Sequence, residues 1–299
     1  MMPFWTIAIW GFFLPITKCL RAEIDQDQEL TLSCPATQSL LIESARYWAP
    51  EGGFLCFDLI NAFQLTKDHC DFKESCSLDT TVGAIYADPC LGQTKRLAVI
   101  YQCTRVAEKD ENSVLTLDCS TTPYPYLVIK RARYWAPDGG ALCGLLDVTT
   151  LTRDKCDYKE SCTLDTTPGA LYLDPCLGVK KKLAVSYDCS RVAQIGENSV
   201  LNLDCSEKYL VIEGAKYWAP DGILCLELPD AFQLTRDHCD LKESCSLNTT
   251  PGEFYGDPCW LVTKKLAVSY TCTCKDGLLL ERDGSCLTSS SKCLPNKII

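Results

Sequence analysis

Long apolar runs are scarce in this chain, which restricts its relation to membranes. The one long run, FWTIAIWGFFL, lies near the start and is followed by a proline and then by the sequence LRA. Because the run is short for a bilayer span, it predicts a secretory signal peptide over residues 1–22, although the usual basic start is missing; the alternative is an uncleaved anchor. The polar C-terminal residues lack the tail of a lipid-anchor signal. We therefore expect a soluble, secreted, extracellular protein without membrane insertion.

Histidine is equally scarce, with two residues, His69 and His238, in 299. Neither lies near a plausible pair of nucleophile and base, and Lys155 replaces them in the middle of the chain, so we expect no enzyme activity. The cysteine spacings Cys56-x13-Cys70 and Cys70-x5-Cys76 are not those of zinc knuckles. The sequence therefore predicts neither a metal nor a cofactor.

Clusters of lysine and arginine are absent as well. The chain has 29 Lys and Arg against 39 Asp and Glu, a net charge of -10. Binding to nucleic acid or to an anionic membrane depends on positive charge that meets phosphate. Neither class of partner is expected.

Cysteine, in contrast, is abundant, with 22 residues in a chain that begins with a predicted signal peptide. This number indicates an oxidising compartment and a framework of disulfides. Six positions recur three times, and six cysteines allow 15 pairings, among which spacing alone cannot choose. The recurring residues are Cys34, Cys56, Cys70, Cys76, Cys90 and Cys103, then Cys119, Cys143, Cys156, Cys162, Cys176 and Cys189, then Cys205, Cys225, Cys239, Cys245, Cys259 and Cys272.

Three tandem repeats account for this recurrence. The stretch DPCLGQTKRLAVIYQC returns as DPCLGVKKKLAVSYDC and as DPCWLVTKKLAVSYTC. The predicted boundaries are 23–104, 105–190 and 191–273, with short polar joints between repeats and a cysteine-rich tail over 274–299. Units of about 85 residues are large enough to fold separately but small enough to need cross-links.

Within a repeat the pattern is mainly that of antiparallel strands. In repeat one, alternation and turn residues predict strands over Glu29–Cys34, Leu40–Trp48, Ser75–Asp79 and Leu97–Cys103. The mixed segment Ala62–Glu74 does not follow a period of two and predicts one or two helical turns. The fold class is therefore mostly β (α+β), with three small disulfide-linked, sandwich-like units and a short helix in each.

These motifs resemble the sea-urchin-egg-lectin type of galactose- and rhamnose-binding domain. That family has an Asp-Pro-Cys-x-Gly-Thr-x-Lys-Tyr-Leu motif, which DPCLGQTKRL and DPCLGVKKKL match well; DPCWLVTKKL matches partly, with Leu261 in place of glycine. The likeness covers nearly all of the three repeats. It departs at the family's Tyr-Gly-Arg motif, where this chain reads Tyr-Trp-Ala beginning at Tyr47, Tyr134 and Tyr217. Two of the family's usual eight cysteines per domain are also absent.

The resemblance implies a disulfide pattern. Its longest bridge restricts the unfolded chain by about 4 kcal/mol in the loop-entropy account. The implied pairs are Cys34–Cys103, Cys56–Cys90 and Cys70–Cys76, then Cys119–Cys189, Cys143–Cys176 and Cys156–Cys162, then Cys205–Cys272, Cys225–Cys259 and Cys239–Cys245.

The resemblance also implies sugar ligands, a glutamate on the early strand together with the aspartate and lysine of the late motif. Carboxylates accept bonds from neighbouring hydroxyls and an ammonium donates to a third. Repeat two has Lys130 at the glutamate position and is expected to bind most weakly or not at all. The implied residues are Glu43, Asp88 and Lys95, then Asp174 and Lys181, then Glu213, Asp257 and Lys264.

A structural role competes with each of these assignments. Aspartate before proline commonly caps a turn, and charged strand positions are often only solvated. Trp48, Trp135 and Trp218 either stack on a sugar or pack under the shortened loop.

Two further features belong to repeat three and the tail. Asn248 begins an N-glycosylation motif that is followed by Pro251. If Cys19 leaves with the signal peptide, an odd number of cysteines remains, and the pairing of Cys274, Cys286 and Cys293 stays open. This parity predicts either an inter-chain bridge, giving a disulfide-linked dimer, or a free thiol.

The sequence thus leads to two hypotheses. The first is a secreted, non-enzymatic, multivalent lectin that binds galactose- or rhamnose-type sugars on cell-surface or microbial glycans without metal. The second keeps the fold without sugar binding and assigns an extracellular protein-interaction or structural role, because Tyr-Gly-Arg is lost in every repeat.

Overall fold

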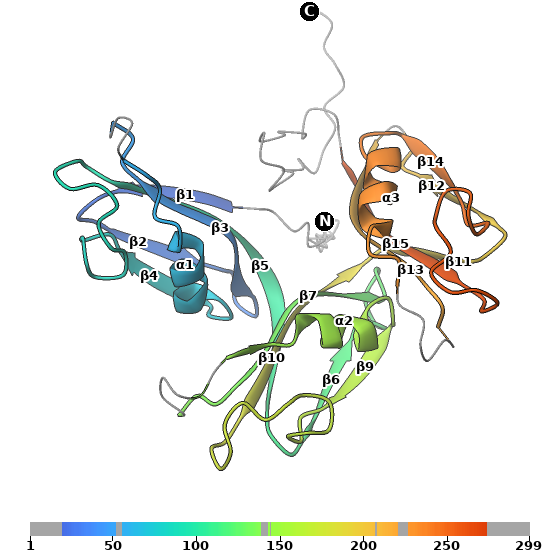
Figure 1. The fold of residues 1–299 in the computed structure, drawn as a ribbon, viewed down its shortest axis with the longest axis horizontal. Coiled ribbons are helices and arrows are strands. Elements are labelled where there is room, and N and C mark those ends of the chain that lie inside the picture. The colour runs from blue at the N-terminus through green and yellow to red at the C-terminus, as the bar shows by residue number, and fades with distance from the viewer. Residues whose placement is uncertain are drawn as a thin grey trace, which may run out of the picture.

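The computed structural model describes residues 20–51, 56–138, 143, 145–206, 208–220 and 227–273. These form three units of similar architecture that follow one another along the chain (Figure 1). The signal segment before residue 20, Cys225, and the tail 274–299 with its three cysteines lie outside the described residues. The predictions of a tail dimer and of a free thiol therefore remain predictions.

Each unit combines a larger antiparallel sheet, a two-stranded sheet and one helix. The larger sheets of units one and two are continuous as one six-stranded sheet, whereas that of unit three is a separate sheet of three strands. The middle strand of the larger sheet pairs with the early strand on one side and with the strand that enters the unit on the other. Unit one contains β1 (Leu20–Asp25), β2 (Glu29–Ser33), β3 (Ser39–Trp48), α1 (Ala62–Cys70), β4 (Ser75–Asp79) and β5 (Arg96–Asp110). Unit two contains β6 (Val114–Asp118), β7 (Tyr126–Trp135), β8 (Leu146–Asp147), α2 (Thr149–Cys156), β9 (Ser161–Asp165) and β10 (Lys182–Ser190). Unit three contains β11 (Val192–Gly196), β12 (Val200–Asp204), β13 (Tyr209–Trp218), α3 (Ala231–Cys239), β14 (Ser244–Asn248) and β15 (Lys265–Thr273).

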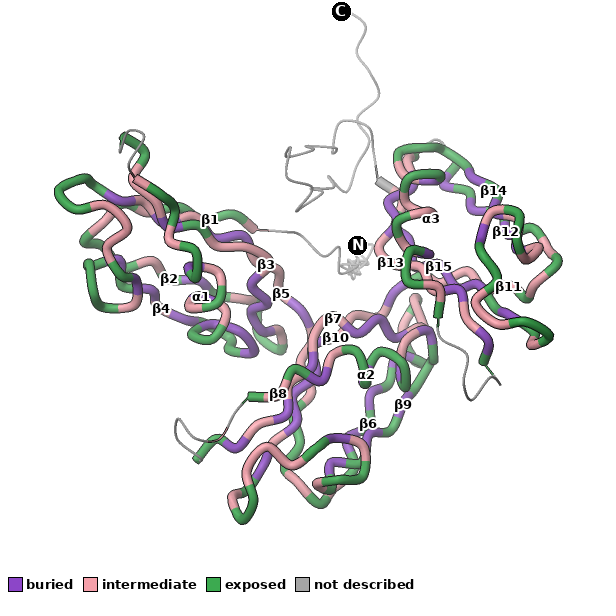
Figure 2. Tube along the Cα trace, in the orientation of Figure 1, coloured by how far each residue is buried: buried purple, intermediate pink, exposed green. Residues whose placement is uncertain are grey.

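Each core lies between the two sheets and the helix. In unit one the alternation of β5 places Leu97, Val99 and Tyr101 on the core face, where they meet Leu32 of β2 and Leu78 of β4. Figure 2 shows buried residues along the strands of all three units and exposed residues on the loops and along parts of the helices. The predicted mostly β, sandwich-like fold with one short helix per unit is confirmed.

The disulfides join the layers of each unit. The described residues form eight of the bonds that the resemblance implied, and Cys259 is bonded as well, although its predicted partner Cys225 lies outside the described residues. No described cysteine is free. The eight bonds are Cys34–Cys103, Cys56–Cys90, Cys70–Cys76, Cys119–Cys189, Cys143–Cys176, Cys156–Cys162, Cys205–Cys272 and Cys239–Cys245.

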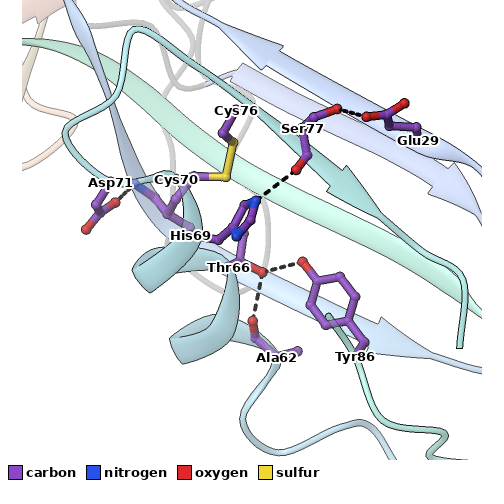
Figure 3. Close-up of a disulfide and its surroundings, with 10 residues drawn as sticks. Glu29, Ala62, Thr66, His69, Cys70, Asp71, Cys76, Ser77 and Tyr86 are labelled. Atoms are coloured by element: carbon purple, nitrogen blue, oxygen red, sulfur yellow. Dashed lines mark hydrogen bonds between the residues drawn. A yellow bond between two sulfur atoms is a disulfide. The ribbon is translucent and has the colours of Figure 1, made fainter. Parts of the chain in front are cut away.

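The helix of unit one is held by side-chain hydrogen bonds in its middle and in its last turn (Figure 3). The Thr66 hydroxyl donates to the Ala62 carbonyl at 2.7 Å and lies 2.8 Å from the Tyr86 hydroxyl. His69 donates from Nε2 to the Ser77 carbonyl at 3.0 Å, beside the Cys70–Cys76 bond. These contacts give His69 a structural role.

The joint between units one and two is not a loop. β5 has 15 residues, so the segment predicted as the joint, beginning at Thr104, continues the strand and pairs with β10 in register from Arg105 to Asp110. The Thr104 and Ser186 hydroxyls also lie 2.5 Å apart across the two units. The second joint is interrupted at Arg191, between β10 and β11. The chain therefore passes rigidly from unit one into unit two.

β1 was not predicted, because its first residues were assigned to the signal peptide. Leu20 pairs with Tyr101 and Ala22 with Val99, so the predicted cleavage point after Ala22 falls inside a strand. A chain that begins at Glu23 keeps only the second half of β1.

Among the described residues, no helix is long and apolar enough to cross a membrane.

Candidate functional site

The Asp-Pro turn and the following lysine form a compact ion pair in each unit. In unit one the Asp88 Oδ1 atom accepts a hydrogen bond from the Cys90 backbone N–H at 2.8 Å and lies 2.7 Å from Lys95 Nζ. The aspartate therefore caps its own turn and also binds the lysine, so the structural and the ligand interpretations of this residue are compatible. Both contacts end on Oδ1, which leaves Oδ2 available as an acceptor.

The same arrangement recurs in the other two units. Asp174 Oδ1 lies 3.1 Å from Lys181 Nζ, and Asp257 Oδ1 lies 2.9 Å from Lys264 Nζ. The aspartates also accept from the backbone N–H groups of Cys176 and Cys259, at 2.9 and 3.0 Å. The lysine stems are enclosed, so that only 2–4% of each lysine is exposed, whereas the aspartates keep about a fifth of their side chains in solvent.

A third residue, at the end of the entering strand, completes each site. Lys181 Nζ lies 3.5 Å from Glu111 Oε2, and Lys264 Nζ lies 3.4 Å from Glu197 Oε2. Unit one has Gln26 at this place, and its Oε1 atom accepts from the Lys95 backbone N–H at 3.2 Å. The sequence interpretation missed these residues. We call the three sets corner one (Gln26, Asp88, Lys95), corner two (Glu111, Asp174, Lys181) and corner three (Glu197, Asp257, Lys264).

Electrostatics keep the corner aspartates ionised. The hydrogen bond from Lys95 has the largest effect on the pKa of Asp88 and, with the backbone N–H of Cys90, holds that pKa below its usual range although burial opposes it. In corner three, burial lowers the pKa of Lys264, but the Asp257 and Glu197 carboxylates outweigh it and raise that pKa. Each corner is therefore a charged group of fixed geometry whose open side consists mainly of carboxylate or amide oxygens.

The predicted early-strand residues lie elsewhere. Glu43 occupies a bulge, because the register of β3 against β5 shifts between Ile42 and Ser44. Ile100, which faces Ser44, is five residues beyond Lys95, so Glu43 lies roughly 17 Å along the strand from corner one. Lys130 and Glu213 occupy the matching bulges of β7 and β13. The structure thus brings the predicted aspartate and lysine together but does not bring the predicted glutamate to them.

The bulge residues meet at the boundaries between units instead. Lys130 Nζ lies 3.6 Å from Asp188 Oδ2, with 19% and 16% of their side chains exposed, and Ser190 donates to Glu213 at 3.5 Å. Burial by itself lowers the pKa of Lys130, but the surrounding carboxylates outweigh burial and raise it. We call this group the bulge cluster; it consists of Glu43, Lys130, Asp188 and Glu213. Lysine at the early-strand position of repeat two is therefore explained as the counter-ion of carboxylates from all three units.

The three tryptophans of the Tyr-Trp-Ala motifs pack against protein. The Arg46 guanidinium lies over Trp48 and the Arg133 guanidinium over Trp135, at 4.5 and 4.1 Å from the ring centroids. Trp218 faces Tyr158 of unit two, with 6.5 Å between ring centroids. These contacts favour packing over sugar stacking for the tryptophans.

Asn248 is half-buried at the end of β14. Its Nδ2 atom donates to Glu253 at 3.0 Å and its Oδ1 atom accepts from the Thr250 backbone N–H at 2.9 Å. Glycosylation at Asn248 stays a prediction.

Comparison with known proteins places the chain in a family. An L-rhamnose-binding lectin of Oncorhynchus keta is 31% identical over 143 residues, which cover 44% of this chain and 49% of that lectin. A rhamnose-binding lectin of Silurus asotus is 25% identical over 233 residues, covering 69% and 74%. A D-galactoside-specific lectin of Heliocidaris crassispina is 32% identical over 99 residues, which cover 29% of this chain and 92% of that lectin. No family model matches the chain.

The chain therefore belongs to the sea-urchin-egg-lectin type of galactose- and rhamnose-binding lectins. The chain spans about half the length of the Oncorhynchus keta relative.

Proposed function

We propose that this protein is a secreted, metal-independent lectin that binds galactose- or rhamnose-type sugars at its three corners. The observation that carries the proposal is the threefold recurrence of an ionised aspartate, held by an enclosed lysine, at a partly open edge of the fold. If Asp88 only capped the turn, its hydrogen bond from the Cys90 backbone N–H would be enough, and the enclosed lysine would not be needed.

The chemistry differs from the one that the sequence suggested. Each lysine is too enclosed to offer its full set of donors, so its main role is to position the carboxylates. The free oxygens of Asp257 and Glu197 then accept from neighbouring sugar hydroxyls, and a hydrogen bond to a charged acceptor is about twice as strong as a neutral one. Ligand contact is thus proposed for the corner residues, while Glu43 and Glu213 are assigned to the boundaries between units.

Three corners also make the protein multivalent. Single sites of this size bind weakly, but simultaneous engagement raises the overall avidity by roughly 10² to 10⁴ toward repetitive glycans. Cell-surface or microbial glycans are the proposed partners. We propose no catalytic activity for the corners. The disulfides agree with an extracellular location.

The test removes the charge of a corner without leaving an unpaired ion. Asp→Asn keeps the turn cap and Lys→Met keeps the aliphatic stem. Asp88→Asn with Lys95→Met at corner one, and the same pair of changes together with Glu111→Gln or Glu197→Gln at corners two and three, therefore yields a charge-free variant. We expect wild-type protein to bind galactosides or rhamnosides on a glycan array, and the charge-free variant to lose binding while keeping its melting temperature within a few degrees.

The matched control changes charge in the bulge cluster, with Glu43→Gln and Glu213→Gln. Glycan binding is expected to persist in this variant. If the array stays blank with correctly oxidised wild-type protein, the sugar proposal is wrong.

A second candidate function is protein interaction without sugar. It is favoured by one observation: the tyrosines of the altered Tyr-Trp-Ala motifs are fully buried, and the Tyr47 hydroxyl donates to the Thr80 carbonyl at 3.2 Å, so they present no polar group to a ligand. A blank array together with a specific protein ligand would support this alternative.

A further inference from the structure

Corner three differs from the other two in the loop that follows its aspartate. Leu91 and Leu177, three residues after the aspartates of corners one and two, are each 88% exposed. The equivalent residue of unit three is Trp260, which is 82% exposed. All three corners therefore have an exposed apolar side chain beside them, but only corner three has an indole.

The next residue differs too. Gly92 and Gly178 have φ of +77°, and Leu261 replaces them at φ +63°. A non-glycine residue in this left-handed region costs about 1 kcal/mol or more. At 97% exposure Leu261 gains no burial in return within the described structure. An apolar pair that is both exposed and strained indicates contact with something outside the folded unit.

The turn holds this pair close to the charged groups of corner three. The Cys259 backbone N–H donates to Asp257 Oδ1 at 3.0 Å, and Trp260 is the next residue along the chain. An exposed indole on the turn that Asp257 caps suits a pyranose, which has hydroxyls on its edge and C–H bonds on one face. Aromatic side chains with an apolar face and a polar edge suit such partly wet contacts.

We propose that Trp260, supported by Leu261, is a stacking platform for the saccharide that Asp257 and Glu197 hold, which makes corner three the strongest of the three sites. This inference rests on the proposed sugar-binding function. It assigns to corner three a preference for sugars with a continuous C–H face or a methyl group, such as galactosides and 6-deoxy sugars. Corners one and two, with a leucine, lack the flat surface.

The experiment isolates one corner at a time in the full, oxidised chain. Corners one and two are made charge-free by the Asp→Asn and Lys→Met pairs, with Glu111→Gln added at corner two, and binding of methyl β-galactoside and methyl α-rhamnoside is measured by calorimetry. Trp260→Leu, which restores the residue type of the other corners, is expected to weaken binding about tenfold, equivalent to about 1.4 kcal/mol. Because Trp260 is exposed, its replacement should leave the melting temperature unchanged.

A reciprocal variant tests whether an indole is enough to strengthen sugar binding at another corner. In a chain that keeps only corner two, Leu177→Trp is expected to strengthen binding severalfold. Quenching of tryptophan fluorescence by sugar should be present in the corner-three chain and absent after Trp260→Leu.

The outcomes separate the two proposals. If Trp260→Leu binds as tightly as its parent, while a charge-free corner three abolishes binding, the stacking platform is wrong and the proposed function stands. If the parent chain binds neither glycoside, both the proposed function and the platform fail.

Discussion

The corners and the bulge cluster contain the same kinds of side chain, on or beside the same strands, yet they have different uses. At corners two and three, one lysine lies between two carboxylates that keep about a fifth of their side chains in solvent. In the bulge cluster, Lys130 and its carboxylates lie against neighbouring units. Charge at a strand position therefore does not identify a ligand site. What distinguishes the two is whether another unit already covers the charged groups.

The two boundaries between units also differ in whether a charged group is paired across the boundary. Between units one and two, Arg131 pairs with Asp71 and donates to the Ile42 carbonyl at 3.1 Å. Gly214 stands at the place of Arg131 in unit three, and its close neighbours are the hydroxyls of Ser269 and Tyr158. Asp157, the counterpart of Asp71 in unit two, therefore lacks an arginine from the following unit at this position.

The largest expected effect comes from removing the cation of the bulge cluster. Lys130→Met leaves Asp188 and Glu213 without their nearest counter-ion in a largely buried place. Breaking one side of a buried pair costs 3–5 kcal/mol, and partial exposure reduces this to about 2 kcal/mol here. Urea denaturation checks the loss of stability, and limited proteolysis checks loosening between units.

The matched control is the charge-free corner one, Asp88→Asn with Lys95→Met, where both charges leave together. Its loss of stability should be clearly smaller. If the two variants unfold at the same urea concentration, the distinction between corner and cluster is contradicted.

A pH effect is the next in size and comes from the second boundary. Burial raises the pKa of Asp157 to about 7, although the Ile129 backbone N–H and nearby cations oppose this. The folded state then binds more protons than the unfolded state between the two pKa values, so stability rises as pH falls from about 8 toward 5. The expected slope is at most about 1.4 kcal/mol per pH unit.

Thermal unfolding from pH 8 to pH 5 measures this effect. Asp157→Asn keeps the acceptor for the Ile129 N–H and should flatten the dependence. Glycan binding should stay constant over the same range, because the pKa values of the corner aspartates are lowered, not raised. An unchanged slope in the variant would rule out Asp157 as its source.

The smallest expected effect concerns the third corner residue. Gln26→Glu gives corner one the second carboxylate of the others, and Glu197→Gln removes it from corner three. We expect a few-fold gain and a few-fold loss of sugar affinity, since each change alters the charge of one acceptor. Calorimetry on chains that keep a single charged corner measures both. If neither Gln26→Glu nor Glu197→Gln changes the sugar affinity, the third corner residue does not contact sugar. Its role would then be limited to accepting a hydrogen bond from the lysine backbone N–H.

Much of the fold could be predicted from the sequence because the repeats give the same signals three times. Alternation located β2, β3, β4 and the start of β5, and the cysteine pattern with the family likeness gave the disulfides. β1 was missed because it follows directly on the apolar leader. The end of β5 was missed because its polar residues, Thr104 to Asp110, pair across units, and no local pattern reports that pairing.

The site was predicted only in part for a similar reason. Asp88 and Lys95 stand in one motif, so their contact follows from local sequence. The third residue comes from the entering strand, which was not recognised, and Glu43 was assigned in its place. A signal was present: Gln26, Glu111 and Glu197 each stand eight residues before the first cysteine of a repeat. The role of Lys130 as a counter-ion depends on contacts with all three units, and no local sequence pattern indicates those contacts.

The unbroken course of β5 sets a distance between two of the binding sites. Lys95 immediately precedes the strand and Glu111 immediately follows it, so corners one and two sit at its opposite ends. Sixteen residues of extended chain span roughly 50 Å at most. A glycan that occupies both corners at once must therefore carry branches or neighbouring chains whose spacing lies within that length.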